Sequence, residues 1–254
     1  MGDKPSIGIV LSGGAARGLL HIGVLKALEV YDISPTHISG SSMGAIVGAL
    51  YAAGISPEEM LEIASTKSFI NFFNFHWKGG GILQHRFLEK LLKEKIPHNT
   101  FSQLAKKLYI CTTNLSKECY EVFSEGEICK PVIASASIPV LFKPVKIHTD
   151  YHVDGGLLNN LPAQPLNDCN VLIGVNAVNY SGQMTYLHTR TVLAQVFNLV
   201  IKQNMQPNLK KCDEIIAPTF EKINDLMDFS KAKELYEIGY KEGKRLAMAL
   251  NAKK

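Results

Sequence analysis

Tryptophan, paired cysteines and long apolar runs are scarce in this chain of 254 residues. It contains one tryptophan and five cysteines, Cys111, Cys119, Cys129, Cys169 and Cys212. Because their number is odd and no two form a C-x-x-C pair, they indicate neither a disulfide framework nor a zinc site. We therefore expect a cytoplasmic protein in a reducing compartment. No metal and no cofactor are expected.

No membrane-spanning helix is expected from the sequence. The longest apolar run, Met43 to Ile55, is interrupted by glycines and is shorter than the roughly 18 residues that a spanning helix needs. The first residues lack the cationic start and apolar stretch of a secretory signal. Contact with a membrane is therefore expected to be peripheral if it occurs.

The basic residues do not form a dense block in this chain. The formal net charge is +4, and the basic residues are spread along the sequence instead of forming a dense Lys/Arg block. This distribution argues against a nucleic-acid partner. The hydrophobic content of 46% is enough for a large buried core, and no repeat or linker interrupts it, so we expect one domain over residues 6–252.

Strand-like and helix-like segments alternate along the chain. Strands are expected at residues 7–11, 37–40, 108–113, 119–123, 171–178 and 214–217, and helices at 16–31, 43–53, from 56 onward, 191–205 and 231–250. Alternation of this kind is typical of a parallel sheet with helices on both faces. The predicted fold class is therefore α/β, a three-layer sandwich with a mostly parallel central sheet.

The stretch Gly40-Ser41-Ser42-Met43-Gly44 lies between a predicted strand and a predicted helix. G-x-S-x-G in this context is typical of a nucleophile elbow, in which two glycines allow a tight turn that exposes the serine hydroxyl. The start of the next helix supplies N–H groups and partial positive charge beside it. The alternative is an ordinary helix-capping serine.

A glycine-rich turn, Ser12 to Gly18, follows the first predicted strand. Its backbone N–H groups suit a phosphate or an oxyanion. The glycines are misplaced for the dinucleotide pattern G-x-G-x-x-G, and the Gly-Lys-Ser/Thr of a Walker loop is absent. An oxyanion next to the turn that carries Ser42 is the interpretation that remains.

Asp154, in Val153-Asp154-Gly155-Gly156, is the candidate base. A serine hydroxyl needs an acceptor for its proton, and a desolvated aspartate in direct contact can serve. An Asp-Gly turn without function is the alternative. Asp154 is the carboxylate that we expect beside Ser42.

Taken together, these three stretches resemble the patatin-like phospholipase family over most of the chain. The residues that carry the resemblance are Gly13-Gly14-Ala15-Ala16-Arg17-Gly18, Gly40 to Gly44, Asp154-Gly155-Gly156, Ala134 to Pro139, Phe142-Lys143-Pro144 and His21 to Leu25. The resemblance implies a patatin-like variant of the α/β-hydrolase fold and a Ser42–Asp154 dyad. It also implies an oxyanion hole at Gly13, Gly14, Ala15 and Arg17, with supporting glycines at positions 18, 40, 44, 155 and 156.

Ala15 departs from the family pattern, because a glycine usually stands there. Alanine resists the positive φ values that glycine accepts, so the shape of the oxyanion loop is an open point, with Gly14 and Ala15 as the expected donors. A third catalytic residue is an alternative to the dyad. Only His188 follows Asp154 in the order of a usual triad, whereas His148 and His152 precede it.

The expected activity is hydrolysis of phospholipid or lysophospholipid acyl esters through an acyl-enzyme. The alternatives are a carboxylesterase or thioesterase for soluble acyl esters, and a noncatalytic lipid- or phosphate-binding module. Two segments bear on the lipid partner. The aromatic residues of 69–77 form either a mobile cover or core, and the basic segment 231–254 forms either a membrane-surface helix or the solvated face of a docked helix.

Overall fold

The computed structural model describes residues 5–72, 85–179, 189–220 and 228–252. Its strands are β1 (Ile7–Leu11), β2 (His37–Ser41), β3 (Lys107–Asn114), β4 (Cys119–Phe123), β5 (Val145–Ile147), β6 (Asp150–Asp154), β7 (Val171–Val175) and β8 (Glu214–Ile216). Its helices are α1 (Leu20–Val30), α2 (Met43–Ala52), α3 (Pro57–Ala64), α5 (Arg86–Lys95), α6 (Cys129–Ser135), α7 (Thr189–Leu209) and α8 (Ala232–Ala252). Short 3-10 helices are η1 (Ala15–Leu19), η2 (Phe101–Gln103), η3 (Gly155–Leu157), η4 (Gln164–Leu166) and η5 (Phe229–Lys231).

The strands form one eight-stranded sheet. Its order is β5-β6-β3-β2-β1-β7-β8, with β4 also paired to β3. The pairings β3–β2, β2–β1, β1–β7 and β7–β8 are parallel, and β4, β5 and β6 join in antiparallel fashion. The prediction of a mostly parallel central sheet is therefore confirmed for the part of the sheet formed by β3, β2, β1, β7 and β8.

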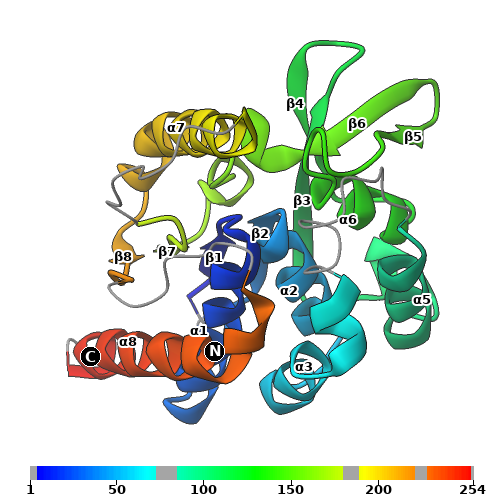
Figure 1. Ribbon diagram of the computed structural model, residues 1–254. Helices are drawn as coiled ribbons and strands as arrows, with labels where there is room; N and C mark the ends of the chain where they lie inside the picture. Colours follow the sequence, from blue (N-terminus) through cyan, green and yellow to red (C-terminus); the bar gives the residue numbers. More distant parts are fainter. Residues whose placement is uncertain (1–4, 73–84, 180–188, 221–227, 253–254) are drawn as a thin grey trace.

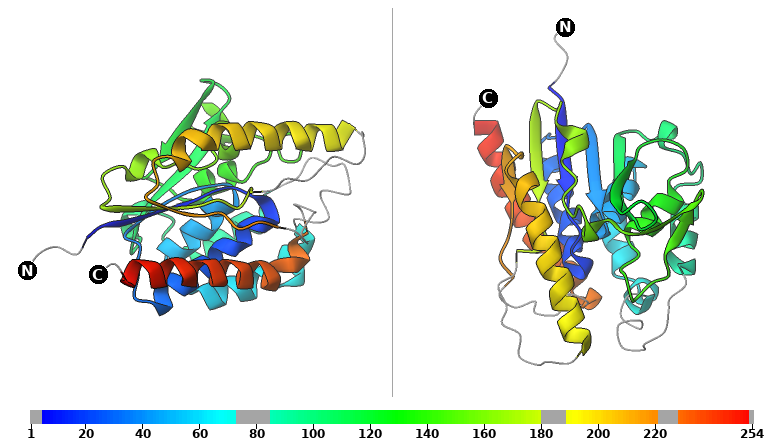
Figure 2. Two further views of the ribbon diagram at one scale, coloured as in Figure 1. Left: turned by 90° about the vertical axis from the view of Figure 1, so that its left-hand side faces the viewer. Right: turned by 90° about the horizontal axis from the view of Figure 1, so that it is seen from above.

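Helices cover both faces of the sheet, which gives three layers (Figure 1). Alternate residues of β1 face opposite cores, because successive side chains of a strand point to opposite sides. Ile9 and Leu11 belong to the larger core with α1, α2 and α8, whereas Val10 packs with Ile201 and Met205 of α7. Figure 2 shows α7 on one face of the sheet and α1 and α8 on the other.

Several local predictions are met closely. Ser56 caps α3, its hydroxyl accepting the Glu59 N–H at 3.2 Å, and Pro57 begins the helix. The C-terminal helix α8 is docked on α1, with Leu235 and Leu246 buried, so its basic residues lie on the remaining face. No helix in the described ranges has both the length and the apolar character needed to cross a bilayer.

Other elements differ from the prediction. The expected single helix over 16–31 is a 3-10 turn, η1, followed by α1, because Ala15 to Leu19 wind more tightly as the chain leaves β1. The expected strand 171–178 ends at Val175. The short antiparallel hairpin of β5 and β6, whose last residue is Asp154, carries no strong alternation in sequence and was not predicted.

Candidate active site

The two candidate catalytic residues meet because two strands share one edge of β3. Strand β2 ends with Ser41 opposite Cys111, and β6 ends with Asp154 opposite Thr112. Strand β4 pairs with this same part of β3, so it occupies the other edge. Consequently β2 and β6 lie end to end on one edge, and Ser42, the residue after β2, faces Asp154.

The pair is buried and directly hydrogen-bonded. Ser42 Oγ donates to Asp154 Oδ2 at 2.6 Å, and the Gly156 N–H donates to Asp154 Oδ1 at 2.7 Å. Ser42 is 7% exposed and Asp154 is 1% exposed. Burial raises the pKa of Asp154 from 3.8 to about 7, against the opposing effect of these two hydrogen bonds. Its carboxyl group can therefore exchange a proton near neutral pH.

Ser42 has the backbone of a nucleophile elbow. Its φ and ψ are 54° and −124°, a sparsely populated region for a residue with a side chain, and such a conformation costs about 1–3 kcal/mol. A Cβ on Gly40 would lie 2.5 Å from the Gly44 carbonyl oxygen, and one on Gly44 would lie 2.1 Å from the Leu11 carbonyl oxygen. Both glycines are therefore required by the close approach of β1, β2 and α2.

The glycine-rich turn borders Ser42. The Gly13 N–H donates to the Asn160 carbonyl at 3.2 Å, and a Cβ on Gly13 would lie 2.9 Å from Ser42 Cβ. Gly13 therefore shapes the turn, and its own N–H is engaged. Ala15 adopts a φ of 48°, the conformation that its side chain disfavours, and it lines the same cleft as Ser42. Gly14 and Ala15 stand at the start of η1, where N–H groups have no partner within the helix, so they remain the candidate oxyanion donors.

Arg17 lies within η1, the 3-10 helix at the end of this loop. It is completely buried, and its guanidinium lies 5.0 Å from the centroid of the Phe220 ring. Such a cation–π contact stabilises a desolvated cation. A Cβ on Gly18 would lie 2.6 Å from Met43 Cβ, so this glycine allows η1 to pack against α2. The place of Arg17 beside the oxyanion hole stays a prediction.

The last residue of α6 and the segment that follows it hold the backbone of both candidate residues. Ser135 Oγ accepts the Ser42 N–H at 2.9 Å and donates to the Cys111 carbonyl at 2.6 Å. Two residues later, the Ser137 carbonyl accepts the Asp154 N–H at 2.9 Å. These roles were missed in the sequence, although both serines lie within the family-like stretch from Ala134 to Pro139. Only the three-dimensional contact shows what they do.

His21 supports the glycine-rich turn. Its Nε2 lies 2.8 Å from the Ser12 carbonyl oxygen, which can only accept, so Nε2 carries the hydrogen. Burial lowers the pKa of His21 to about 4 and keeps the ring neutral. Ser12 Oγ in turn accepts the Ala177 N–H at 2.9 Å. The Ser12 carbonyl, which precedes the candidate oxyanion donors Gly14 and Ala15, is therefore held in place by the N–H of a neutral imidazole.

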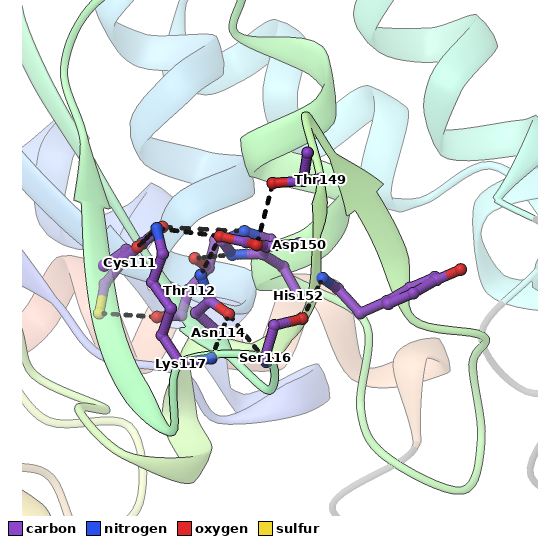
Figure 3. Close-up of polar contacts among 10 residues, drawn as sticks. Cys111, Thr112, Asn114, Ser116, Lys117, Thr149, Asp150 and His152 are labelled. Carbon is purple, nitrogen blue, oxygen red and sulfur yellow. Dashed lines mark hydrogen bonds and ion pairs between the residues drawn. The ribbon is translucent and has the colours of Figure 1, made fainter.

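A polar network fixes β6 to the turn between β3 and β4 (Figure 3). Asn114 Nδ2 donates to Asp150 Oδ2 at 3.0 Å, and Lys117 Nζ lies 2.9 Å from that oxygen. The hydrogen bond from Lys117, followed by that from Asn114, lowers the pKa of Asp150 to about 2. Ser116 Oγ accepts the Tyr151 N–H at 3.0 Å. The beginning of β6 is thus held in register with β3, four residues before Asp154.

The histidines do not complete a triad in the described part of the chain. His152 Nδ1 lies 3.0 Å from Thr112 Oγ1, and its Nε2 lies 3.7 Å from Glu121, so the ring is engaged away from Ser42. His148 is exposed in the turn before β6. His188, the alternative that follows Asp154 in sequence, lies outside the described residues.

Among the described residues, no cluster of His, Cys, Asp and Glu side chains is arranged to hold a metal ion.

A cleft lined mainly by apolar side chains opens beside Ser42. Its lining residues are Ala15, Ser42, Met43, Ile46, Ala136, Ile138, Phe142 and Phe229. Phe69 and Phe72 are 2% and 8% exposed and pack behind it, with ring centroids 6.1 Å from Phe229 and from Phe142 respectively. The described part of the aromatic segment 69–77 is therefore core. The rest of that segment and Gly79 to Gly81 lie outside the described residues.

The patatin-like phospholipase family model matches residues 9–167, which is more than half of the chain. The chain belongs to the patatin-like phospholipase family. The resemblance read from the motifs is thereby confirmed.

One relative is "Lysophospholipase nte1" of Aspergillus fumigatus, 27% identical over 97% of this chain and 18% of that protein. Another is "Neuropathy target esterase sws" of Drosophila melanogaster, 29% identical over 64% of this chain and 12% of that protein. The patatin-like chain thus spans less than a fifth of these relatives. The crystal structure of VipD from Legionella pneumophila matches 97% of this chain and 67% of its own, with a TM-score of 0.55 and 15% identity, which shows a shared fold.

Proposed function

We propose that this patatin-like chain hydrolyses acyl esters of phospholipids or lysophospholipids, with Ser42 as nucleophile and Asp154 as the base. The 2.6 Å hydrogen bond between Ser42 Oγ and Asp154 Oδ2 is the observation that carries the proposal. The pKa of Asp154, raised to about 7, suits a base that takes a proton and later returns it. The family and the names of the two relatives support a lipid ester as the substrate.

The first half of the reaction forms an acyl-enzyme. The Ser42 hydroxyl proton passes to Asp154 Oδ2 while Ser42 Oγ attacks the carbonyl carbon of the ester. The carbonyl oxygen becomes an oxyanion that accepts hydrogen bonds from the N–H groups of Gly14 and Ala15. When this intermediate collapses, the ester C–O bond breaks and the proton on Asp154 goes to the departing alkoxide.

The second half releases the fatty acid. Asp154, again a carboxylate, accepts a proton from a water molecule whose oxygen attacks the acyl carbon. The bond to Ser42 Oγ then breaks, and the proton on Asp154 returns to that oxygen. The aliphatic and aromatic lining of the cleft suits the acyl chain of the substrate. Because the lipid substrate would come from a bilayer, the proposal includes peripheral contact of the protein with a membrane.

Matched substitutions test the dyad. Ser42→Ala and Asp154→Asn are expected to abolish hydrolysis of lysophospholipid, because loss of a serine nucleophile costs about 10⁶-fold in kcat in another serine hydrolase. Ser42→Ala is also expected to abolish fluorophosphonate labelling. Ser39→Ala on β2 and Asp168→Asn, at an exposed position before β7, are the controls, since each removes the same functional group at a position outside the pair.

The outcomes separate the alternatives. Undiminished hydrolysis by either Ser42→Ala or Asp154→Asn rejects the dyad. A panel of phospholipid, lysophospholipid and short p-nitrophenyl or thioester substrates distinguishes a lipid hydrolase from an esterase or thioesterase for soluble compounds. Binding of lipid without turnover of any ester in the panel identifies a noncatalytic module instead.

A further inference from the structure

Helix α7 presents aliphatic side chains to solvent. Val192, Val196, Leu199 and Val200 are 38%, 51%, 51% and 37% exposed. Their spacing of three and four residues places them along one side of the helix, and we call these four residues the α7 stripe. Ile201 and Met205 pack on the other side, against the sheet. A surface helix normally has polar residues facing solvent, so an apolar side opposite the core is a candidate contact surface.

The stripe lies on the helix that contacts the turn following Asp154. Figure 2 shows α7 running along the sheet, with its amino-terminal half extending beyond the carboxyl ends of the parallel strands, where Ser42 lies. One turn after Val200, Asn204 Nδ2 donates to the carbonyls of Gly156 and Leu157 at 2.9 and 3.2 Å. The helix is therefore fastened to the turn that follows Asp154, and whatever contacts the stripe is brought to the edge of the sheet that holds the site.

The charge around the stripe favours an anionic lipid surface. From Cys169 to Cys212 the sequence contains no aspartate or glutamate, but it contains Arg190, Lys202, Lys210 and Lys211. Lys210 and Lys211, which directly follow α7, are exposed. Aliphatic residues together with cations and without acids are typical of helices that lie in the interface of an anionic bilayer.

The kind of apolar residue in the stripe argues against a protein partner. Side chains that dominate protein–protein interfaces are mostly tryptophan, tyrosine and arginine, and valine and leucine are under-represented among them. The α7 stripe consists only of valine and leucine. Its composition therefore suits the acyl region of a bilayer better than a specific protein surface.

We propose that the α7 stripe inserts into the boundary between headgroups and acyl chains of an anionic bilayer, with the nearby lysines on the headgroups. This inference rests on the proposed function, because the role of membrane binding is to bring the cleft beside Ser42 to a lipid substrate. The binding itself requires no turnover, so the two proposals can be tested separately.

Vesicle binding by the Ser42→Ala protein tests the surface without hydrolysis of the vesicles. The probe is co-sedimentation with phosphatidylcholine vesicles, with and without phosphatidylglycerol. Val196→Glu/Leu199→Glu is expected to weaken partition onto the phosphatidylglycerol vesicles by about tenfold or more, because two apolar contacts become two anionic ones. Val30→Glu/Met248→Glu is the matched control, since these residues are 51% and 54% exposed on α1 and α8, across the sheet from α7. It is expected to bind as the parent does.

The results distinguish the inference from its alternatives. Equal binding by the two double variants overturns the proposal, and so does equal binding to vesicles with and without phosphatidylglycerol. The stripe is assigned to a second copy of the chain instead if three results coincide. The parent protein is a dimer in light scattering, Val196→Glu/Leu199→Glu dissociates this dimer, and the parent does not bind vesicles. With Ser42 present, Val196→Glu/Leu199→Glu is expected to keep full activity on a short soluble ester and lose activity on vesicles. Inactivity of the parent on every ester contradicts the proposed function alone.

Discussion

The buried carboxyl group of Asp154 affects both catalysis and the stability of the fold. The substitution Asp154→Asn measures its effect on the free energy of unfolding. Burial raises the pKa of Asp154 from 3.8 to about 7 in the folded protein, whereas the unfolded chain has an ordinary value. A carboxyl group whose pKa is raised in the folded state favours folding fully when the pH is below its pKa in the unfolded chain. This contribution to the free energy of unfolding is lost as the pH rises to the pKa of the folded state. At about 1.4 kcal/mol per pH unit, the loss between pH 4 and pH 7 is about 4 kcal/mol.

Asparagine has nearly the same shape and no charge to bury. Its oxygen can accept the Gly156 N–H and its amide can donate to Ser42 Oγ, in place of the two hydrogen bonds that Asp154 accepts. The free energy of unfolding of Asp154→Asn minus that of the parent is therefore expected to rise by up to about 4 kcal/mol from pH 4 to pH 7, and to stay level above pH 7.

Urea unfolding of both proteins at half-unit steps from pH 4 to pH 9 gives this difference directly, because all other titrating groups cancel. Asp150→Asn is the control on the same strand. The pKa of Asp150 is lowered to about 2, so Asp150→Asn is expected to show no such rise between pH 4 and pH 7. A flat or falling curve for Asp154→Asn would refute the reasoning, since it would mean that the carboxyl group is not desolvated.

Two further predictions follow from the same geometry. The kcat/KM for a soluble ester is expected to rise about tenfold per pH unit up to about pH 7 and then level off, because only the deprotonated form of Asp154 can accept the Ser42 proton; a profile that is flat from pH 5 to pH 9 contradicts this role. Ser135→Ala leaves the buried Ser42 N–H and Cys111 carbonyl without their partner, so it is expected to lower the free energy of unfolding by about 1–3 kcal/mol and to lower kcat more than it changes KM. Ser137→Ala loses only a hydroxyl bond to the Ile133 carbonyl within the same helix end, and equal effects of the two substitutions in unfolding and kinetic assays would show that Ser135 has no special role.

The sequence predicted the parts of the fold that local patterns encode. Ile7–Leu11 is a short apolar run bounded by glycines, and Ser56-Pro57 begins a helix with a recognisable cap. Gly40 and Gly44 on either side of Ser42 predicted a turn between a strand and a helix, and the close approach of three backbone segments explains why both are glycines. In each case the residues that form the structure are neighbours along the chain.

The parts that were missed depend on contacts between distant residues. Strand β6 has a mixed pattern and is held by Asn114 and Lys117 from another hairpin, so its own residues carry a weak strand signal. The function of Ser135 depends on Ser42, 93 positions earlier, and a serine near a helix end has many ordinary uses. The positive φ of Ala15 is likewise imposed by the packing of the loop, because the sequence alone disfavours it.

The end-to-end meeting of β2 and β6 makes enzymatic activity a sensitive indicator of strand alignment. Strand β6 pairs with β3 through only three residues, from His152 to Asp154. A slip of one residue would turn the Asp154 carboxyl group to the opposite face of the sheet, while most of the parallel sheet and both hydrophobic cores stayed intact. A deletion or insertion of one residue between Asp150 and Asp154 is thus a way to obtain a folded protein that has lost its base.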